Sequence, residues 1–218
     1  MINSSQLLSA SEQFDETWSQ TLTLREKKMF LLGILVVATT RNDSLLLDKW
    51  LLQCDGILML EEIEEVLLQT LLFAGFPRTI ESLKHLRKVY PKSSLPKHVD
   101  DYQAAGEATS RIVYGKHHSR LKEVMDDLHP DLTRWMIEDG YGRVLSRPGL
   151  NLQERELSVV ASLMASGMIN QYRAHLRGAM LCGVKRVDII WFTNTFKCII
   201  AADLRSEFQQ VTEQMLEV

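Results

Sequence analysis

The stretch that decides the fold runs from Asp131 to Ile189 and reads DLTRWMIEDGYGRVLSRPGLNLQERELSVVASLMASGMINQYRAHLRGAMLCGVKRVDI. In its middle a Gly-rich turn with Pro148 leads into a helix, and a second helix follows, which carries His175 on a face of small residues. Two acid-base side chains, Glu156 and His175, therefore lie on consecutive helices that must pack on each other. We expect this pair to be the functional centre.

The composition is that of a globular protein with an ordinary charged surface. Of the 218 residues 45% are hydrophobic and 24% are charged, and the net charge is -3. Such a charge gives no long-range attraction to nucleic acid or to anionic membranes. The longest apolar run, Met29 to Ala38, is far shorter than the roughly 20 residues of a membrane helix. Because the N-terminus lacks the features of a secretory signal, we expect a cytoplasmic protein that contacts neither membrane nor nucleic acid.

The cysteines and histidines give little sign of a metal or thiol centre. Cys54, Cys182 and Cys198 are odd in number and far apart, which argues against a disulfide framework and leaves no CxxC pair. The histidines lack the spacing of a metal-binding helix such as HExxH. We expect neither a metal nor a cofactor.

Helical signals recur along the whole chain, whereas strand alternation is absent, so the predicted fold class is all-α. Thr23 and Glu26 form a capping-box pattern before an almost wholly apolar helix. In the helix expected from Leu60, Glu61, Glu62, Glu64 and Glu65 are interpreted as capping residues and a solvated face. A helix from Pro130 is expected to break at Gly140 before a loop over residues 141–149.

An internal repeat divides the chain. The segment LTLREKKMFLLGILVVATTRN from Leu22 matches the apolar pattern of LNLQERELSVVASLMASGMIN from Leu150. The first copy carries Lys28 at the position of Glu156, and Leu47, Asp48 or Lys49 at that of His175. We therefore predict a degenerate first repeat over 1–90 that acts as scaffold, a linker over 91–98, and a second repeat over 99–218 with the site. Since duplicated helical units pair and form closed rings, we expect a homo-oligomer, a trimer or a hexamer.

Three segments carry a resemblance to a known family. Residues 129–167, residues 171–189 and EEIEEVLLQTLLFAGFPRTIESL of the first half resemble the carboxymuconolactone decarboxylase family, which also contains the AhpD-like alkylhydroperoxidases. The fixed spacing holds across several helices, so the match is more specific than any short motif. The resemblance implies an AhpD-like helical fold, assembly through helix pairs, and two possible chemistries.

In the peroxidase branch a Glu and a His flank two cysteines. The Glu and the His fall here on Glu156 and His175, but the cysteine positions hold Met168 and Gln171, which can neither attack a peroxide nor resolve a sulfenic acid. The decarboxylase branch needs no thiol, because a His or Glu protonates the carbanion and arginines hold the carboxylates.

The resulting hypothesis is a lyase that acts on a small carboxylated or lactone metabolite. Glu156 and His175 are the predicted catalytic pair, and Arg143, Arg147 and Gln171 are the predicted substrate-binding residues. Each also has a structural interpretation: Glu156 as a helix cap, His175 as a buried partner of a carboxylate, and the arginines as ties between helix ends. A non-catalytic scaffold or ligand-binding protein of the same fold is the first alternative, and an alkylhydroperoxidase is the second.

Overall fold

A computed structural model describes residues 4–94 and 99–217 of the chain, and these residues form helices and no strand, which confirms the all-α prediction. The helices are α1 (Ser4–Ser19), α2 (Leu24–Arg41), α3 (Ser44–Leu51), α4 (Leu60–Gln69), α5 (Leu71–Val89), α6 (Tyr102–Tyr114), α7 (His118–Leu128), α8 (Pro130–Trp135), α9 (Leu152–Ser166), α10 (Ile169–Leu181), α11 (Arg186–Phe196) and α12 (Arg205–Glu217), with a π-helix at Met136–Leu145 and 3-10 turns at Gly115–His117 and Lys197–Ile199.

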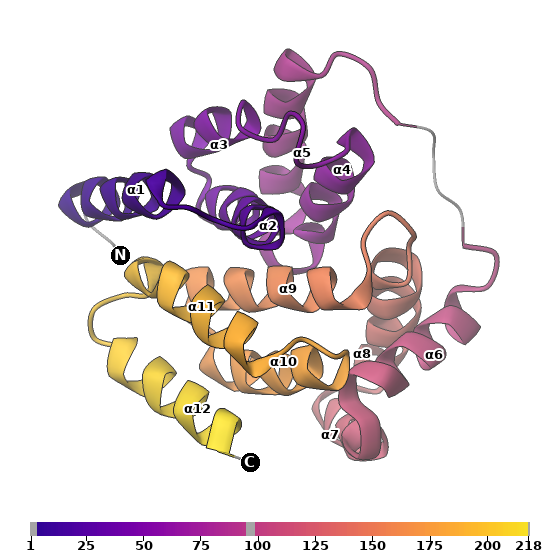
Figure 1. Ribbon diagram of the computed structural model, residues 1–218. Helices are drawn as coiled ribbons and strands as arrows, with labels where there is room; N and C mark the ends of the chain where they lie inside the picture. Colours follow the sequence, from indigo (N-terminus) through magenta and orange to yellow (C-terminus); the bar gives the residue numbers. More distant parts are fainter. Residues whose placement is uncertain (1–3, 95–98, 218) are drawn as a thin grey trace.

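Two apolar helices, α2 and α9, form the centre of the molecule and pack on each other (Figure 1). Every residue of α2 from Met29 to Thr40 is buried, as expected for a helix that is apolar on all sides. In Figure 1 the helices α3 to α5 surround α2 in the upper part, and α10 to α12 lie below α9. One hydrophobic core therefore runs through both halves of the chain, residues 4–94 and 99–217.

The starts of α2 and α9 are built alike. Thr23 and Glu26 form a reciprocal capping box, and Asn151 and Glu154 form another one 128 residues later. This correspondence supports the proposed repeat of one helical unit. The division at residues 91–98 stays a prediction, and residues 95–98 of that linker lie outside the described part of the chain.

The acids of α4 do not form a solvated face, so that interpretation is wrong. Glu62, Glu64 and Glu65 are all buried, although Glu62 does close a capping box with the backbone of Met59. Each of the three meets a cation: Lys28 pairs with Glu62, Arg87 with Glu64, and two arginines of the second half with Glu65. Buried carboxylates need such partners, because their desolvation in isolation is very costly.

The chain does not break at Gly140, as the sequence predicted, but continues as a π-helix to Leu145. Two glycines allow this helix to lie against the backbone of α6. A Cβ at Gly106 would come within 2.0 Å of the carbonyl oxygen of Ile137, and one at Gly142 within 2.0 Å of that of Tyr102. Only residues without a side chain fit this contact, which brings the N-terminal half of α6 and the π-helix together.

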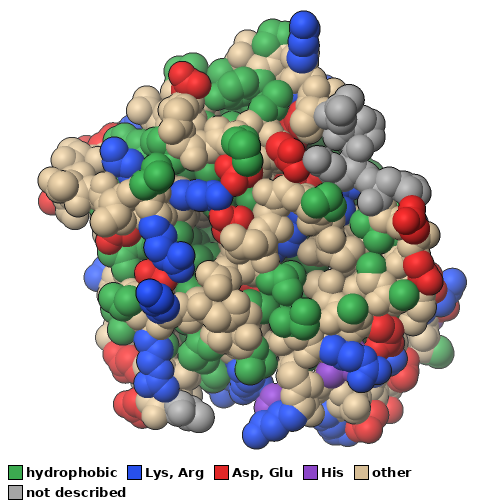
Figure 2. All heavy atoms as spheres, turned by 45° about the vertical axis from the view of Figure 1, so that its right-hand side comes forward, with side chains coloured by type: hydrophobic (Ala, Val, Ile, Leu, Met, Phe, Trp, Pro, Cys, Tyr) green, Lys and Arg blue, Asp and Glu red, His purple; other side chains and the backbone are tan. Residues whose placement is uncertain are grey.

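Charges of both signs are interspersed on the face shown in Figure 2, and hydrophobic side chains reach that surface in several separate groups. No helix in the described ranges is long and apolar enough to cross a membrane. The cytoplasmic location stays a prediction.

The backbone contact between α6 and the π-helix predicts a steric effect of one methyl group. We expect Gly106→Ala to lower the free energy of unfolding by about 1–3 kcal/mol, the range typical of overpacking, because the helix backbones must separate. Chemical denaturation followed by circular dichroism measures this change. Gly140→Ala is the matched control, since its Cβ would lie 4.0 Å from the nearest such atom. Equal stability of the two variants would contradict the proposed contact.

Candidate active site

The structure brings Glu156 and His175 into direct contact. Glu156 lies in the second turn of α9, and His175 lies in the middle of α10, which follows after a left-handed turn at Gly167. The His175 Nδ1 atom is 2.9 Å from Oε2 of Glu156. The Glu156 side chain is 1% exposed and that of His175 is 9% exposed. The pair is therefore a buried carboxylate-imidazole hydrogen bond whose imidazole side reaches toward the surface.

Aromatic rings from two other segments lie beside the imidazole, and a third ring packs on one of them. The ring of Tyr114, at the end of α6, lies 6.1 Å from that of His175, and the ring of Phe73 in α5 lies 6.2 Å from it on an edge-to-face approach. The ring of Tyr141 in the π-helix packs edge-to-face on that of Tyr114, with the ring centres 5.8 Å apart. Because Phe73 belongs to the first half, both halves of the chain contribute to this site.

The environment keeps the hydroxyl groups of Tyr114 and Tyr141 and the thiol of Cys182 protonated. Burial raises the pKa of Tyr114 to about 12, and the negative charge of Glu156 adds to this effect. Burial also raises the pKa of Tyr141 well above its usual value, with further contributions from Tyr114 and Glu156. The pKa of the Cys182 thiol rises to about 12 for the same two reasons, burial first and Glu156 second. The site thus holds neutral hydroxyl and thiol groups around one carboxylate-imidazole pair.

Gly178 makes room for the Glu156 carboxylate. A Cβ at this position would lie 2.5 Å from Oε2 of Glu156 and 2.8 Å from a methyl group of Val113. The small face of α10, recognised in the sequence, therefore lets α6, α9 and α10 meet closely around the pair.

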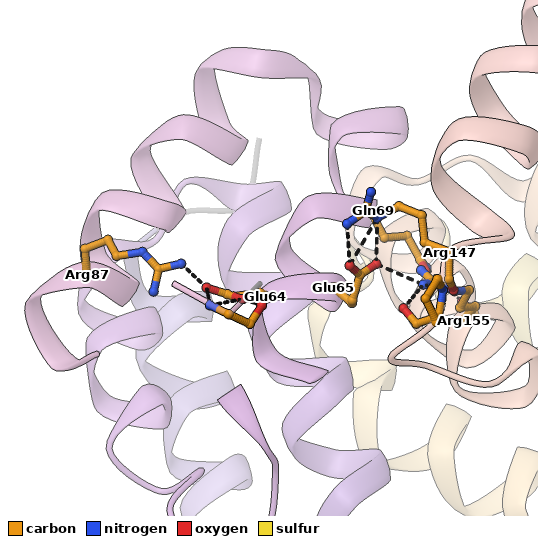
Figure 3. Close-up of polar contacts among 8 residues, drawn as sticks. Glu64, Glu65, Gln69, Arg87, Arg147 and Arg155 are labelled. Carbon is orange, nitrogen blue, oxygen red and sulfur yellow. Dashed lines mark hydrogen bonds and ion pairs between the residues drawn. The ribbon is translucent and has the colours of Figure 1, made fainter. Parts of the chain in front are cut away.

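A buried ionic network fixes the start of α9, just before Glu156 (Figure 3). The Arg155 side chain is 1% exposed, and its guanidinium donates to Glu65 at 3.0 Å and to the carbonyl oxygen of Arg147 at 2.6 Å. Gln69 accepts from the same guanidinium and donates to the backbone carbonyl of Arg155 at 2.9 Å. Figure 3 shows Glu65 and Gln69 of α4 pointing toward Arg147 and Arg155. The first half thereby holds the helix that carries Glu156.

The structure shows Arg143 and Arg147, two of the three predicted substrate-binding residues, in contact with groups other than Glu156 and His175. The Arg143 side chain is exposed, pairs with Asp139 at 3.0 Å and covers the ring of Tyr102 at 4.2 Å. Arg147 binds Glu65 at 2.8 Å and is 20% exposed. Gln171 is exposed in the first turn of α10. Their role in substrate binding stays a prediction.

In the first half, the residue that corresponds to Glu156 has a structural role. Lys28 binds Glu62 at 2.5 Å and Glu154 at 2.7 Å, so it links α4 to the first turn of α9. Leu47, one of the residues that match His175, is buried in the core. This arrangement agrees with the expectation that the first copy serves as scaffold.

Sequence reasoning missed Tyr114, Tyr141 and Phe73. Tyr141 lies in the segment over residues 141–149 for which the sequence predicts a loop. The one available signal was Phe73-Ala74-Gly75, which lies inside the first-half segment on which the family resemblance rests. Nothing in that segment predicts a contact with a histidine 102 positions later in the sequence.

The network around Arg155 predicts a large effect on stability. We expect Glu65→Ala to lower the free energy of unfolding by about 3–5 kcal/mol, because it leaves a buried guanidinium without its counter-charge. Denaturant titration gives the value. Glu123→Ala serves as the control, since its pair with Arg120 is exposed on both sides and is worth about 0–1 kcal/mol. A loss at Glu65 no greater than at Glu123 would refute the importance of the network.

The raised pKa of Cys182 predicts slow thiol chemistry. At pH 8 we expect iodoacetamide to alkylate Cys182 at least about 100-fold more slowly than free glutathione, because very little thiolate is present. Glu156→Gln removes a negative charge, so it should lower this pKa and raise the rate several-fold. Mass spectrometry of the modified peptides resolves the three cysteines. A wild-type rate close to that of glutathione would show that the thiol is ionised.

The raised pKa of Cys182 also makes the stability of the folded protein depend on pH. The folded-state pKa of Cys182, about 12, exceeds the value of 9.0 for an unperturbed thiol. The thiol is therefore protonated in the folded protein over a range in which the unfolded chain ionises. Its contribution to stability is complete below about pH 9 and is lost as the pH rises toward 12.

No family model matches the chain. Curated relatives do match it. "Peroxisomal protein 2" of Schizosaccharomyces pombe is 28% identical over 59% of this chain, and the protein of that name from Saccharomyces cerevisiae is 25% identical over 59%. The 4-carboxymuconolactone decarboxylase of Acinetobacter baylyi is 31% identical over 40% of this chain.

The matches cover 64%, 56% and 66% of the length of these three relatives, in the same order. They confirm the resemblance that the sequence carries, and the all-helical fold agrees with it. The chain is therefore similar to members of the carboxymuconolactone decarboxylase-like family over part of their length.

Proposed function

We propose that this protein is an acid-base enzyme of the decarboxylase type, acting on a small carboxylated or lactone metabolite. The observation that carries the proposal is the buried hydrogen bond of 2.9 Å between Glu156 and His175. A carboxylate that binds one ring nitrogen of a histidine orients the imidazole and stabilises its protonated form. The similarity to 4-carboxymuconolactone decarboxylase supports the choice of reaction class.

Each member of the pair has a defined role in this proposal. Loss of CO2 from a carboxylate whose α-carbon is next to, or conjugated with, an activating carbonyl group leaves a carbanion, and the electron pair of the broken C–C bond stays on that α-carbon. His175 gives its proton to this carbon from Nε2, the ring nitrogen that Glu156 does not bind. Glu156 holds the ring through Nδ1, and its negative charge stabilises the imidazolium before the transfer.

The rings of Tyr114 and Phe73 support a proton-transfer site. They flank the imidazole and limit the access of water, which strengthens electrostatic interactions within the site. Among the residues predicted to bind the substrate's carboxylates we favour Arg147, because its carbonyl oxygen binds Arg155, the neighbour of Glu156. Arg143 and Gln171 remain weaker proposals.

The alternative is a non-catalytic scaffold or ligand-binding protein of the same fold. One observation favours it: both predicted arginines already have carboxylate partners within the protein, Asp139 for Arg143 and Glu65 for Arg147. A substrate carboxylate would have to share or displace these partners. Turnover of a substrate separates this alternative from the enzyme.

An alkylhydroperoxidase is the third option and has the least support. The positions of its two cysteines hold Met168 and Gln171, and the nearby Cys182 has a pKa of about 12. A thiol with that pKa gives too little thiolate to attack a peroxide at neutral pH. Reduction of an organic hydroperoxide that depends on Cys182 would revive this option.

We also propose that the protein assembles as a homo-oligomer, a trimer or a hexamer. Large hydrophobic side chains on α5, α6 and α10 are strongly exposed in the single chain, among them Phe76 at 68% and Ile112 and Leu181 at 50% each. Light scattering coupled to size-exclusion chromatography measures the mass of the particle directly.

The enzyme proposal predicts the loss of turnover in two isosteric variants. With 4-carboxymuconolactone as the test substrate, we expect Glu156→Gln and His175→Asn each to lower kcat/KM by at least about 100-fold, the usual contribution of a positioned acid or base. Release of CO2 and the ultraviolet absorbance of the substrate are the measurements. His129→Gln is the matched control, because His129 is an exposed helix-cap residue.

Circular dichroism tests whether the variants are folded. If both variants retain wild-type turnover, the pair is structural. If the wild-type protein leaves this substrate and related lactone acids unchanged, the scaffold alternative is favoured.

A further inference from the structure

A large cavity lies away from the Glu156 and His175 pair. It is open to solvent on one side, has a volume of about 930 Å³ and is bordered by α1, the C-terminal end of α2, the first turns of α3 and the last turn of α9. Arg78, near the start of the long part of α5, and Ile199 complete its wall. The volume lies within the range of about 300–1,000 Å³ that is usual for small-molecule sites.

The inner wall of this cavity is apolar. Phe14 and Val37 are 1% and 0% exposed and belong to the main core, so they form a rigid base. Leu46 and Ala165 pack on the same core from α3 and α9, and Ile199 closes the far side. The apolar surface that a ligand can reach comes from Leu45, which is 83% exposed, and from the half-buried Leu46 and Ala165. An aliphatic or aromatic ligand body would bury this surface, which favours binding.

The rim of the cavity is cationic. Its charged lining residues are Arg41, Lys49 and Arg78 against the single carboxylate of Asp43. Asp43 is already engaged, since it caps α3 by accepting the backbone N–H of Leu46 at 3.0 Å. A site with this balance attracts an anionic head group.

The two arginines are held in place by backbone carbonyls. Arg41 donates one N–H to the carbonyl oxygen of Ile199, and Arg78 donates one to that of Thr40. Each guanidinium has five N–H groups, so these bonds fix its position and leave further N–H groups to bind a ligand. Lys49 pairs with Asp15, which is half-exposed and is not part of the cavity wall. Positioned forks of this kind suit a carboxylate or a phosphate.

We propose that this cavity is a second binding site, specific for an anionic amphiphile: a carboxylate or phosphate head on an apolar body of the size of a medium-chain fatty acid. The head binds Arg41 and Arg78 at the rim, and the tail lies on Leu45, Leu46 and Ala165. The proposal does not depend on the enzymatic function, because none of these residues belongs to the cluster around His175.

Isothermal titration calorimetry on the full chain tests the proposal, with decanoate, decyl phosphate and decanol below their micelle concentrations. We expect at least one of the two anions to bind at least about tenfold more tightly than decanol, and its affinity to fall as the salt concentration rises. The comparison of decanoate with decyl phosphate identifies the head group. Equal binding of decanol and both anions, or no binding of either anion, would overturn the proposal.

Variants locate the binding. Arg41→Gln combined with Arg78→Gln is expected to weaken binding of the anion at least about tenfold. Arg134→Gln, an exposed arginine paired with Asp131 on α8, is the matched control and should bind within about twofold of the wild type. Ala165→Trp fills the cavity without changing any charge, so it should abolish binding even if the double arginine variant folds poorly.

Glu156→Gln combined with His175→Asn separates this site from the proposed active site. This variant should bind the anion as the wild type does, whatever the outcome of the turnover experiments. Binding that is lost in this variant and kept in Ala165→Trp would place the ligand at the other site and refute the proposal.

Discussion

The buried guanidinium of Arg155 is the constraint on which the arrangement of the two halves depends. A cation with 1% of its side chain exposed must have a counter-charge and further acceptors, or the folded state becomes very costly. Glu65 and Gln69 provide these from one face of α4, and the carbonyl oxygen of Arg147 provides another from the turn before α9. These contacts fix the rotation of α9 about its axis and its position along that axis relative to the first half. Glu156 is the next residue along that helix, so its position follows.

The candidate site is therefore shared between the halves, although the acid-base groups belong to one of them. The first half contributes Phe73 to the ring contacts of His175 and holds the start of α9 through Glu65 and Gln69. In the corresponding position of the first half, Lys28 joins Glu62 to Glu154 and stabilises the same helix start from the other side. A repeat that lost its own chemistry in this way would keep a role as support.

Close helix contacts carry the rest of the site. Gly106 and Gly142 let α6 and the π-helix touch through their backbones. Across this helix pair Tyr141 packs on Tyr114, whose ring lies beside the imidazole. Gly178 lets α10 approach Glu156 in the same manner. The π-helix is uncommon, and here it turns Tyr141 inward from a segment whose composition is typical of a loop.

The sequence by itself determined the features that depend on neighbours a few residues apart. The capping box at Thr23, the all-α class and the placement of Glu156 and His175 on consecutive helices follow from short-range spacing. The direct contact of the two side chains is shown by the structure. The family resemblance rests on the same spacing carried over several helices.

The tertiary structure alone decided which remote groups meet. Burial of Glu62, Glu64 and Glu65, the choice of Asp139 by Arg143 and of Glu65 by Arg147, and the approach of Phe73 to His175 depend on helix packing between distant segments. An acidic run has the same pattern whether it faces water or a buried arginine, because its local preferences are identical in both cases. Only the position of the partner, set by the packing of α4 on α9, distinguishes them.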